Sequence, residues 1–137
     1  MKRVIFACLH NAGRSQMAAA FFNWTADPAK ALAISAGTQP GEHVHPEVLA
    51  VMREIGIDLS SAKPRKLTAE LVQGASLLVT MGCGDACPVV PGARHDDWPI
   101  PDPKGQPLRY VQQIRDEIRQ RVTALVSAEG WSVSGRS

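Results

Sequence analysis

Continuous apolar runs and helically spaced apolar residues follow one another along this chain. Continuous runs are typical of strands that are buried on both faces of a sheet. They predict strands at 2–7, 31–36 and 77–81. A short fourth strand is also expected at 95–98, inside a Gly- and Pro-rich stretch without an apolar run. Apolar residues at helical spacing predict helices over 15–24, 46–55 and 108–129. A shorter helix is expected over 68–72, because Thr68 can cap it and Gly74 follows it.

Alternation of strands with helices is typical of an α/β fold. We therefore expect a three-layer sandwich with a central, mostly parallel four-stranded sheet. The 137 residues suffice for one domain, which we place at 1–131. Residues 132–137 are small and polar and are expected to form a flexible tail. Ligands of such sheets bind beyond the carboxyl ends of the strands.

Charge and composition exclude several classes of partner. The formal net charge is only +2, and the basic residues of 115–121 are interleaved with acidic ones, so we expect neither a nucleic acid nor an anionic membrane as partner. No apolar run is long enough to span a bilayer. The chain is expected to be cytosolic. Three cysteines, an odd number, argue against a static disulfide framework in that reducing compartment.

The first predicted strand ends in a loop suited to binding an oxyanion. The loop reads Cys8-Leu9-His10-Asn11-Ala12-Gly13-Arg14-Ser15, and a helix is predicted directly after it. Backbone N–H groups of such a loop and the helix N-terminus stabilise an anion and also the thiolate of Cys8. Arg14 can bind a tetrahedral oxyanion through two N–H groups, and Ser15 can bond the thiolate. These residues favour a nucleophilic cysteine that attacks phosphate or a similar oxyanion.

Two further segments carry candidate chemistry. Cys83 and Cys87 lie in a glycine-rich loop after the third strand, where mobile cysteines can exchange disulfides. We expect no metal site, because the histidines form no pair that would complete a zinc site with these cysteines. Asp102 stands between two prolines, and it can give a proton to a leaving oxygen if its loop faces Cys8. The alternative for Asp102 is an ordinary Asp-Pro turn.

The stretch Cys8 to Ser15 resembles the signature of low-molecular-weight protein tyrosine phosphatases, and is more similar still to that of the arsenate reductases built on the same fold. Those reductases share several other stretches with residues 3–126 of this chain. The shared stretches are Arg-Ser-Gln-Met-Ala at 14–18, Ser-Ala-Gly at 35–37, Val79-Thr80, Cys-Gly-Asp-Ala at 83–86, the Trp98 to Pro103 loop and Arg-Asp-Glu-Ile at 115–118.

This resemblance implies a relay of three cysteines. Cys8 would attack arsenate that is held by residues 9–15, and Asp102 would protonate the departing hydroxide. Cys83 would then attack Cys8 and release arsenite, which leaves a disulfide between Cys8 and Cys83. Cys87 would attack Cys83 in turn and leave a disulfide between Cys83 and Cys87. The resemblance further implies no bound cofactor, but an external thiol reductant, thioredoxin or a similar protein.

Three alternatives remain open at this stage. One is a tyrosine phosphatase, although Lys104 and Gly105 follow the Asp-Pro where phosphatases of this fold usually carry tyrosines. Another is a reductase that uses mycothiol or glutathione in place of the internal relay. The third is a non-enzymatic anion-sensing or adaptor domain, which would need neither Asp102 nor Cys83.

Overall fold

Four strands and four helices form the part of the chain that the computed structural model describes, residues 1–82 and 94–133. The strands are β1 (Lys2–Cys8), β2 (Ala31–Gly37), β3 (Leu77–Thr80) and β4 (Arg94–Asp97). The helices are α1 (Arg14–Thr25), α2 (Pro46–Arg53), α3 (Ala69–Gln73) and α4 (Leu108–Ala128). Each element lies where it is expected from the sequence, with ends that differ by no more than about two residues, the usual uncertainty of element boundaries.

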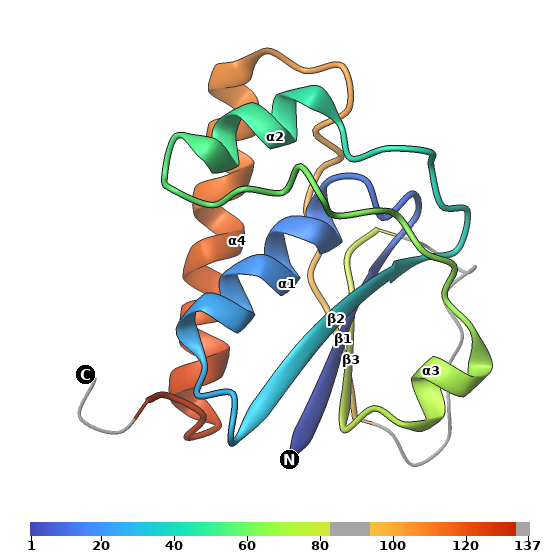
Figure 1. Ribbon diagram of the computed structural model, residues 1–137, viewed down its shortest axis with the longest axis vertical. Helices are drawn as coiled ribbons and strands as arrows, with labels where there is room; N and C mark the ends of the chain where they lie inside the picture. The colour runs from blue at the N-terminus through green and yellow to red at the C-terminus, as the bar shows by residue number, and fades with distance from the viewer. Residues whose placement is uncertain (83–93, 134–137) are drawn as a thin grey trace.

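The sheet has the strand order β2-β1-β3-β4, and every neighbouring pair is parallel. The predicted α/β sandwich is therefore confirmed, with a sheet that is wholly parallel in the described residues. Cys8 pairs with Gly37, and Ala7 pairs with Thr80. The carboxyl ends of β2, β1 and β3 consequently lie at the same end of the sheet, and the loop after Cys8 starts there (Figure 1).

Side chains of β1 alternate between two apolar layers. Val4, Phe6 and Cys8 belong to the larger core, which α1, α2 and α4 cover. Ile5 and Ala7 point to the opposite face and join a smaller core with α3. Figure 1 shows α3 on the far side of the sheet from the other three helices. Burial on both faces explains why this strand is continuously apolar.

The edge strand β4 differs from the other three strands in being polar and exposed along its whole length. Charged side chains on an edge strand discourage pairing with another chain. Trp98, directly after β4, is buried, and its ring lies 5.6 Å from the ring of Phe6. The loop that follows Trp98 is thereby anchored to the main core.

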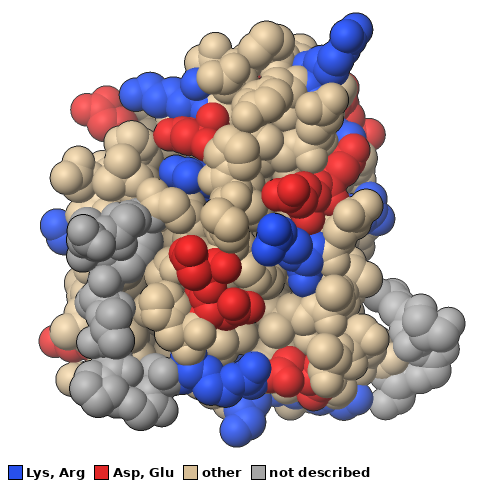
Figure 2. All heavy atoms as spheres, turned by 180° about the vertical axis from the view of Figure 1, so that it is seen from behind, with Lys and Arg blue, Asp and Glu red and all other residues tan. Residues whose placement is uncertain are grey.

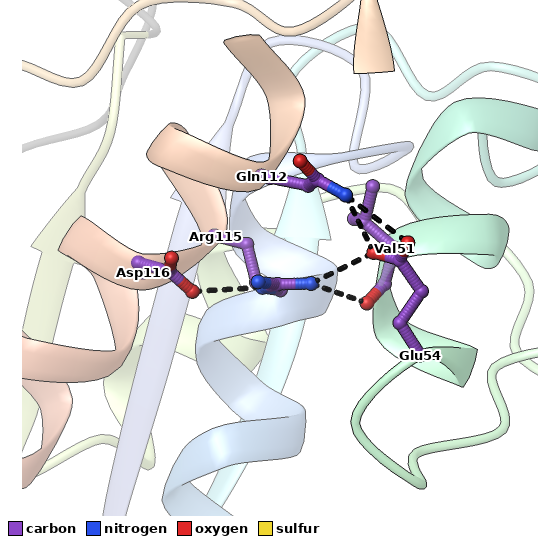
Figure 3. Close-up of polar contacts among 5 residues, drawn as sticks. All are labelled: Val51, Glu54, Gln112, Arg115 and Asp116. Carbon is purple, nitrogen blue, oxygen red and sulfur yellow. Dashed lines mark hydrogen bonds and ion pairs between the residues drawn. The ribbon is translucent and has the colours of Figure 1, made fainter. Parts of the chain in front are cut away.

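A polar cluster joins α2 to α4 (Figure 3). Arg115 donates through Nη1 to the carbonyl of Val51 at 2.9 Å and to Glu54 Oε1 at 3.0 Å, and through Nε to Asp116. Gln112 donates to both carboxylate oxygens of Glu54 at 3.0 Å. The cluster fixes the end of α2, whose first turn lies beside the loop after β1.

Positive and negative residues are interspersed over the face of the molecule that Figure 2 shows. In residues 1–82 and 94–133, no helix combines the length and apolar character needed to cross a bilayer. Ser132, which the sequence places in the tail, forms a β-bridge with Ala26, and its carbonyl accepts a hydrogen bond from Lys30 Nζ. Residues 134–137 lie outside the described part of the chain.

Candidate active site

Cys8 is the last residue of β1, and its side chain is almost fully buried. Its Sγ lies 2.9 Å from Ser15 Oγ, the second residue of α1. Asn11 Nδ2 donates to the same Ser15 oxygen at 2.7 Å. Because Ser15 accepts from Asn11, its own hydroxyl proton remains available to the sulfur. A thiolate at this position therefore gains a hydrogen bond in addition to the dipole of α1.

The loop between Cys8 and α1 has its carbonyl groups turned outward. Four of these carbonyls accept hydrogen bonds from the segment after β2, with the pairs Thr38 N to Cys8 O, Gln39 N to Leu9 O, Gly41 N to His10 O and His45 N to Ala12 O. In a planar trans peptide the N–H points opposite to the carbonyl. The N–H groups of residues 9, 10, 11 and 13 consequently face away from the 38–45 segment. Together with the N-terminus of α1 they can hold an anion.

Asn11 gives the loop its sharp curvature. Its backbone lies in the left-handed region, with φ of 50°, which asparagine tolerates better than most residues. Its Oδ1 accepts from the backbone N–H of Arg65 at 2.9 Å and from Gln16 Nε2 at 3.2 Å. Gly37 packs so tightly beneath the loop that a Cβ there would lie 2.8 Å from both Asn11 N and Leu9 O. The sequence predicts Asn11 in the loop, but it does not predict these hydrogen bonds of its side chain with Arg65 and Gln16.

Arg14 and Asp102 lie together beside this loop. Arg14 is 7% exposed, and its Nη1 donates to the carbonyl of Ile100 at 3.0 Å. Its Nη2 lies 3.8 Å from Asp102 Oδ2. Asp102 Oδ1 accepts from the N–H of Lys104 at 3.0 Å, so the aspartate also forms an ordinary Asp-Pro turn. One carboxylate oxygen thus shapes the loop, while the other faces the guanidinium.

The predicted oxyanion loop, Arg14 and Asp102 therefore lie close together. Pro103, directly after Asp102, packs against Gly13 of the loop. Cys83 and Cys87 are outside the residues that the structure describes. Among residues 1–82 and 94–133, no three His, Cys, Asp or Glu side chains are grouped as metal ligands would be.

A hollow of about 830 Å³ adjoins the loop. Its lining includes the lysines Lys63 and Lys104, the acidic Glu42, and three histidines, His10, His43 and His45. His45 belongs to the loop before α2, where nothing in the local sequence distinguishes it from a solvated residue. The residue is half-buried, with its ring packed near Gly13 and its N–H bonded to Ala12 O. The contact between two distant loops that encloses His45 has no signature in the sequence around it.

Burial lowers the pKa of His45, and the charges of Lys104 and His10 act in the same direction, while Asp102 and Glu47 oppose the shift. Below about pH 6.5 the unfolded chain then binds a proton that the folded chain resists. The contribution of neutral His45 to the free energy of unfolding is fully present above about pH 6.5, and it is lost as the pH falls through the lowered pKa of the folded state. We expect His45→Gln to reduce the loss of urea-unfolding midpoint between about pH 7.5 and about pH 5.5.

His43→Gln is the matched control for that experiment, because His43 lines the same hollow but is exposed. Its unfolding midpoints should follow those of the parent at both pH values. An unchanged acid sensitivity in His45→Gln would show that this histidine does not resist protonation in the fold.

Comparison with known proteins decides the family. Residues 3–129 match the family described as low molecular weight phosphotyrosine protein phosphatase. The chain belongs to this family. A putative arsenate reductase of Halobacterium salinarum is 38% identical over 124 residues, which cover 88% of this chain and 87% of that protein. The glutaredoxin arsenate reductase of a Synechocystis strain is 32% identical over 130 residues, which cover 93% and 98%.

Among solved structures, the thioredoxin-dependent arsenate reductase of Corynebacterium glutamicum superposes with a TM-score of 0.80 at 37% identity. The match covers 93% of the present chain but only 61% of the Corynebacterium chain. These proteins therefore share the fold and the family with this chain, and their names associate that fold with arsenate and with two different reductants.

Proposed function

We propose that this member of the phosphatase family reduces arsenate to arsenite, with Cys8 as the nucleophile. The observation that carries the proposal is the buried Cys8 thiol, 2.9 Å from Ser15 Oγ, at the start of a loop whose N–H groups face away from the 38–45 segment. The names of the relatives support arsenate as that anion. Lys63 and Lys104 in the lining of the neighbouring hollow would favour the approach of a negatively charged substrate.

In the first step, the Cys8 thiolate attacks the arsenic atom of bound arsenate. Arg14 and the loop N–H groups bind the remaining oxygens and stabilise the charge that develops on them. Asp102 gives its proton to the leaving oxygen, which departs as water, and a bond between Cys8 Sγ and arsenic(V) remains. The position of Asp102 Oδ2 beside Arg14 supports this role, because Arg14 would hold the same oxyanion.

The later steps follow the relay that the family resemblance implies. The Cys83 thiolate attacks Cys8 Sγ, and the electron pair of the sulfur–arsenic bond stays on arsenic, which leaves as arsenite. The Cys87 thiolate then attacks Cys83, frees Cys8 and leaves a disulfide between Cys83 and Cys87. An external dithiol reduces that disulfide. The proposal needs no bound cofactor and places the reaction in a reducing cytoplasm.

Cys87→Ser tests the relay. This variant should complete about one turnover and then stall as a disulfide between Cys8 and Cys83, because no later thiol can release Cys8. Peptide mapping of the stalled protein by mass spectrometry identifies the bond. Normal turnover of Cys87→Ser with glutathione or mycothiol would contradict the relay and favour a reductase that uses the small thiol directly.

The physiological reductant is tested by supplying candidates separately. Arsenite formation is measured with thioredoxin and its reductase, with glutaredoxin and glutathione, and with mycoredoxin and mycothiol. We expect thioredoxin to support the highest rate, since a disulfide between two protein thiols is its usual kind of substrate. Because one relative is named a glutaredoxin arsenate reductase, glutaredoxin with glutathione is the main alternative to thioredoxin.

Phosphate-ester hydrolysis is the second candidate function, because the family that matches is named for it. Tyr110, the chain's single tyrosine, lies on α4 rather than directly after Asp102 and Pro103. Lys104 and Gly105 in that place offer no aromatic wall for a tyrosine substrate. We therefore expect only slow hydrolysis of a small aryl phosphate, measured in parallel with arsenate reduction.

A further inference from the structure

The Arg14 guanidinium is held at three sides by parts of the chain that are distant in sequence. Nη1 donates to the carbonyl of Ile100, and Nη2 lies 3.8 Å from Asp102 Oδ2. The third side is the backbone of Gly82, just after β3. The side chain is only 7% exposed, so these neighbours rather than water surround the guanidinium.

Gly82 has no side chain where the guanidinium lies. A Cβ at this residue would overlap Arg14 Nη1 and would lie 3.0 Å from Arg14 Cζ. The guanidinium therefore occupies the space that any other residue at position 82 would fill. Gly82 also has φ of 94°, a left-handed conformation that side chains other than glycine adopt only with strain.

We propose that Gly82 is a positioning residue of the oxyanion site, because its missing side chain lets the Arg14 guanidinium lie where it can bind the substrate. The proposal rests on the oxyanion-binding role proposed above for Arg14. A residue with a Cβ would push the end of the flexible arginine away while the surrounding backbone stays in place. Arg14 would then lose its bond to Ile100 and its alignment with the loop N–H groups.

The effect of a displaced guanidinium differs from that of backbone strain, and the chain contains a matched control. Gly56 has φ of 86°, close to that of Gly82, but a Cβ there would meet nothing within 4 Å. Gly56→Ala and Gly82→Ala thus introduce similar backbone strain. Only Gly82→Ala also places a methyl group against Arg14.

The test measures binding of inorganic phosphate by isothermal titration calorimetry in the full chain. Gly82→Ala should raise the dissociation constant about tenfold or more, in keeping with a lost charge-assisted hydrogen bond. Gly56→Ala should stay within about twofold of the parent. Equal losses in both variants, or no loss in Gly82→Ala, would overturn the proposal. A parent chain that binds no phosphate would instead refute the oxyanion function itself.

A double-mutant cycle with Arg14→Lys shows whether the effect passes through the arginine. Lysine has no atom where Nη1 lies, so the severe overlap between Nη1 and a Cβ at position 82 is removed, and only a tight contact near the position of Cζ remains. In the Arg14→Lys background, Gly82→Ala should therefore change phosphate affinity by less than about twofold. The same tenfold loss in that background would contradict a role through Arg14.

If Gly82→Ala does not fold, Gly82→Asn replaces it in both arms of the test. Asparagine tolerates a left-handed backbone better than alanine does, but it has the same Cβ. Thermal unfolding is recorded for every variant. A folded Gly82→Asn with parental phosphate affinity would overturn the proposal as clearly as the alanine variant.

Discussion

Replacement of Cys8 by serine should abolish arsenate reduction. A serine hydroxyl at this position is a far weaker nucleophile than the thiolate, and it cannot form the disulfide on which release of arsenite depends. Steady-state arsenite formation should fall below detection with every reductant. Hydrolysis of a small aryl phosphate should disappear as well, because it requires the same nucleophile.

Oxyanion binding is the internal control for Cys8→Ser. The carbonyls of the loop bond to the 38–45 segment and Arg14 bonds to Ile100, and neither set of contacts involves the sulfur. The dissociation constant of phosphate should therefore change little. Near-normal turnover of Cys8→Ser would end the hypothesis that this residue attacks arsenate.

Asp102→Asn should slow the first chemical step by about a hundredfold or more, the usual contribution of a positioned general acid. Asparagine keeps the carbonyl oxygen that can accept from the N–H of Lys104, so the turn survives while the transferable proton is lost. The measurement is a rapid-mixing single-turnover experiment at saturating arsenate. Arsenate affinity should change little.

Asp27→Asn is the matched control for this variant. Asp27 also accepts a hydrogen bond from the N–H two residues later, that of Ala29 at 2.9 Å, but it lies next to the N-terminal end of β2. Its rate should equal that of the parent. A parental single-turnover rate in Asp102→Asn would reduce Asp102 to a turn residue.

The strands and helices could be predicted because local patterns specify them. β1 is buried on both faces and reads as a continuous apolar run, and α4 buries one stripe of residues at helical spacing. The polar β4 was the hardest element to predict. An edge strand that faces solvent has no apolar signature, and only its pairing with β3 identifies it.

The sequence places Cys8 and Arg14 at the two ends of one loop, because a strand, a small-residue loop and a helix follow one another there. The structure shows that Asp102 lies beside Arg14, as expected if its loop faces Cys8, while the catalytic roles of these residues stay predictions. What surrounds these residues could not be predicted. The Ile100 carbonyl and Gly82 reach Arg14 from separate loops, and His45 approaches Gly13 through a third. Such contacts depend on how the sheet brings loop ends together, and no pattern within a single segment encodes them.

The most direct test of the account is a single turnover without any external reductant. Fully reduced protein is mixed with excess arsenate, and both arsenite and remaining free thiols are counted. If Cys8, Cys83 and Cys87 act in sequence, each chain should release about one arsenite and lose two of its three thiols. A chain that releases no arsenite and keeps all three thiols would contradict the proposal that this protein reduces arsenate with its own cysteines.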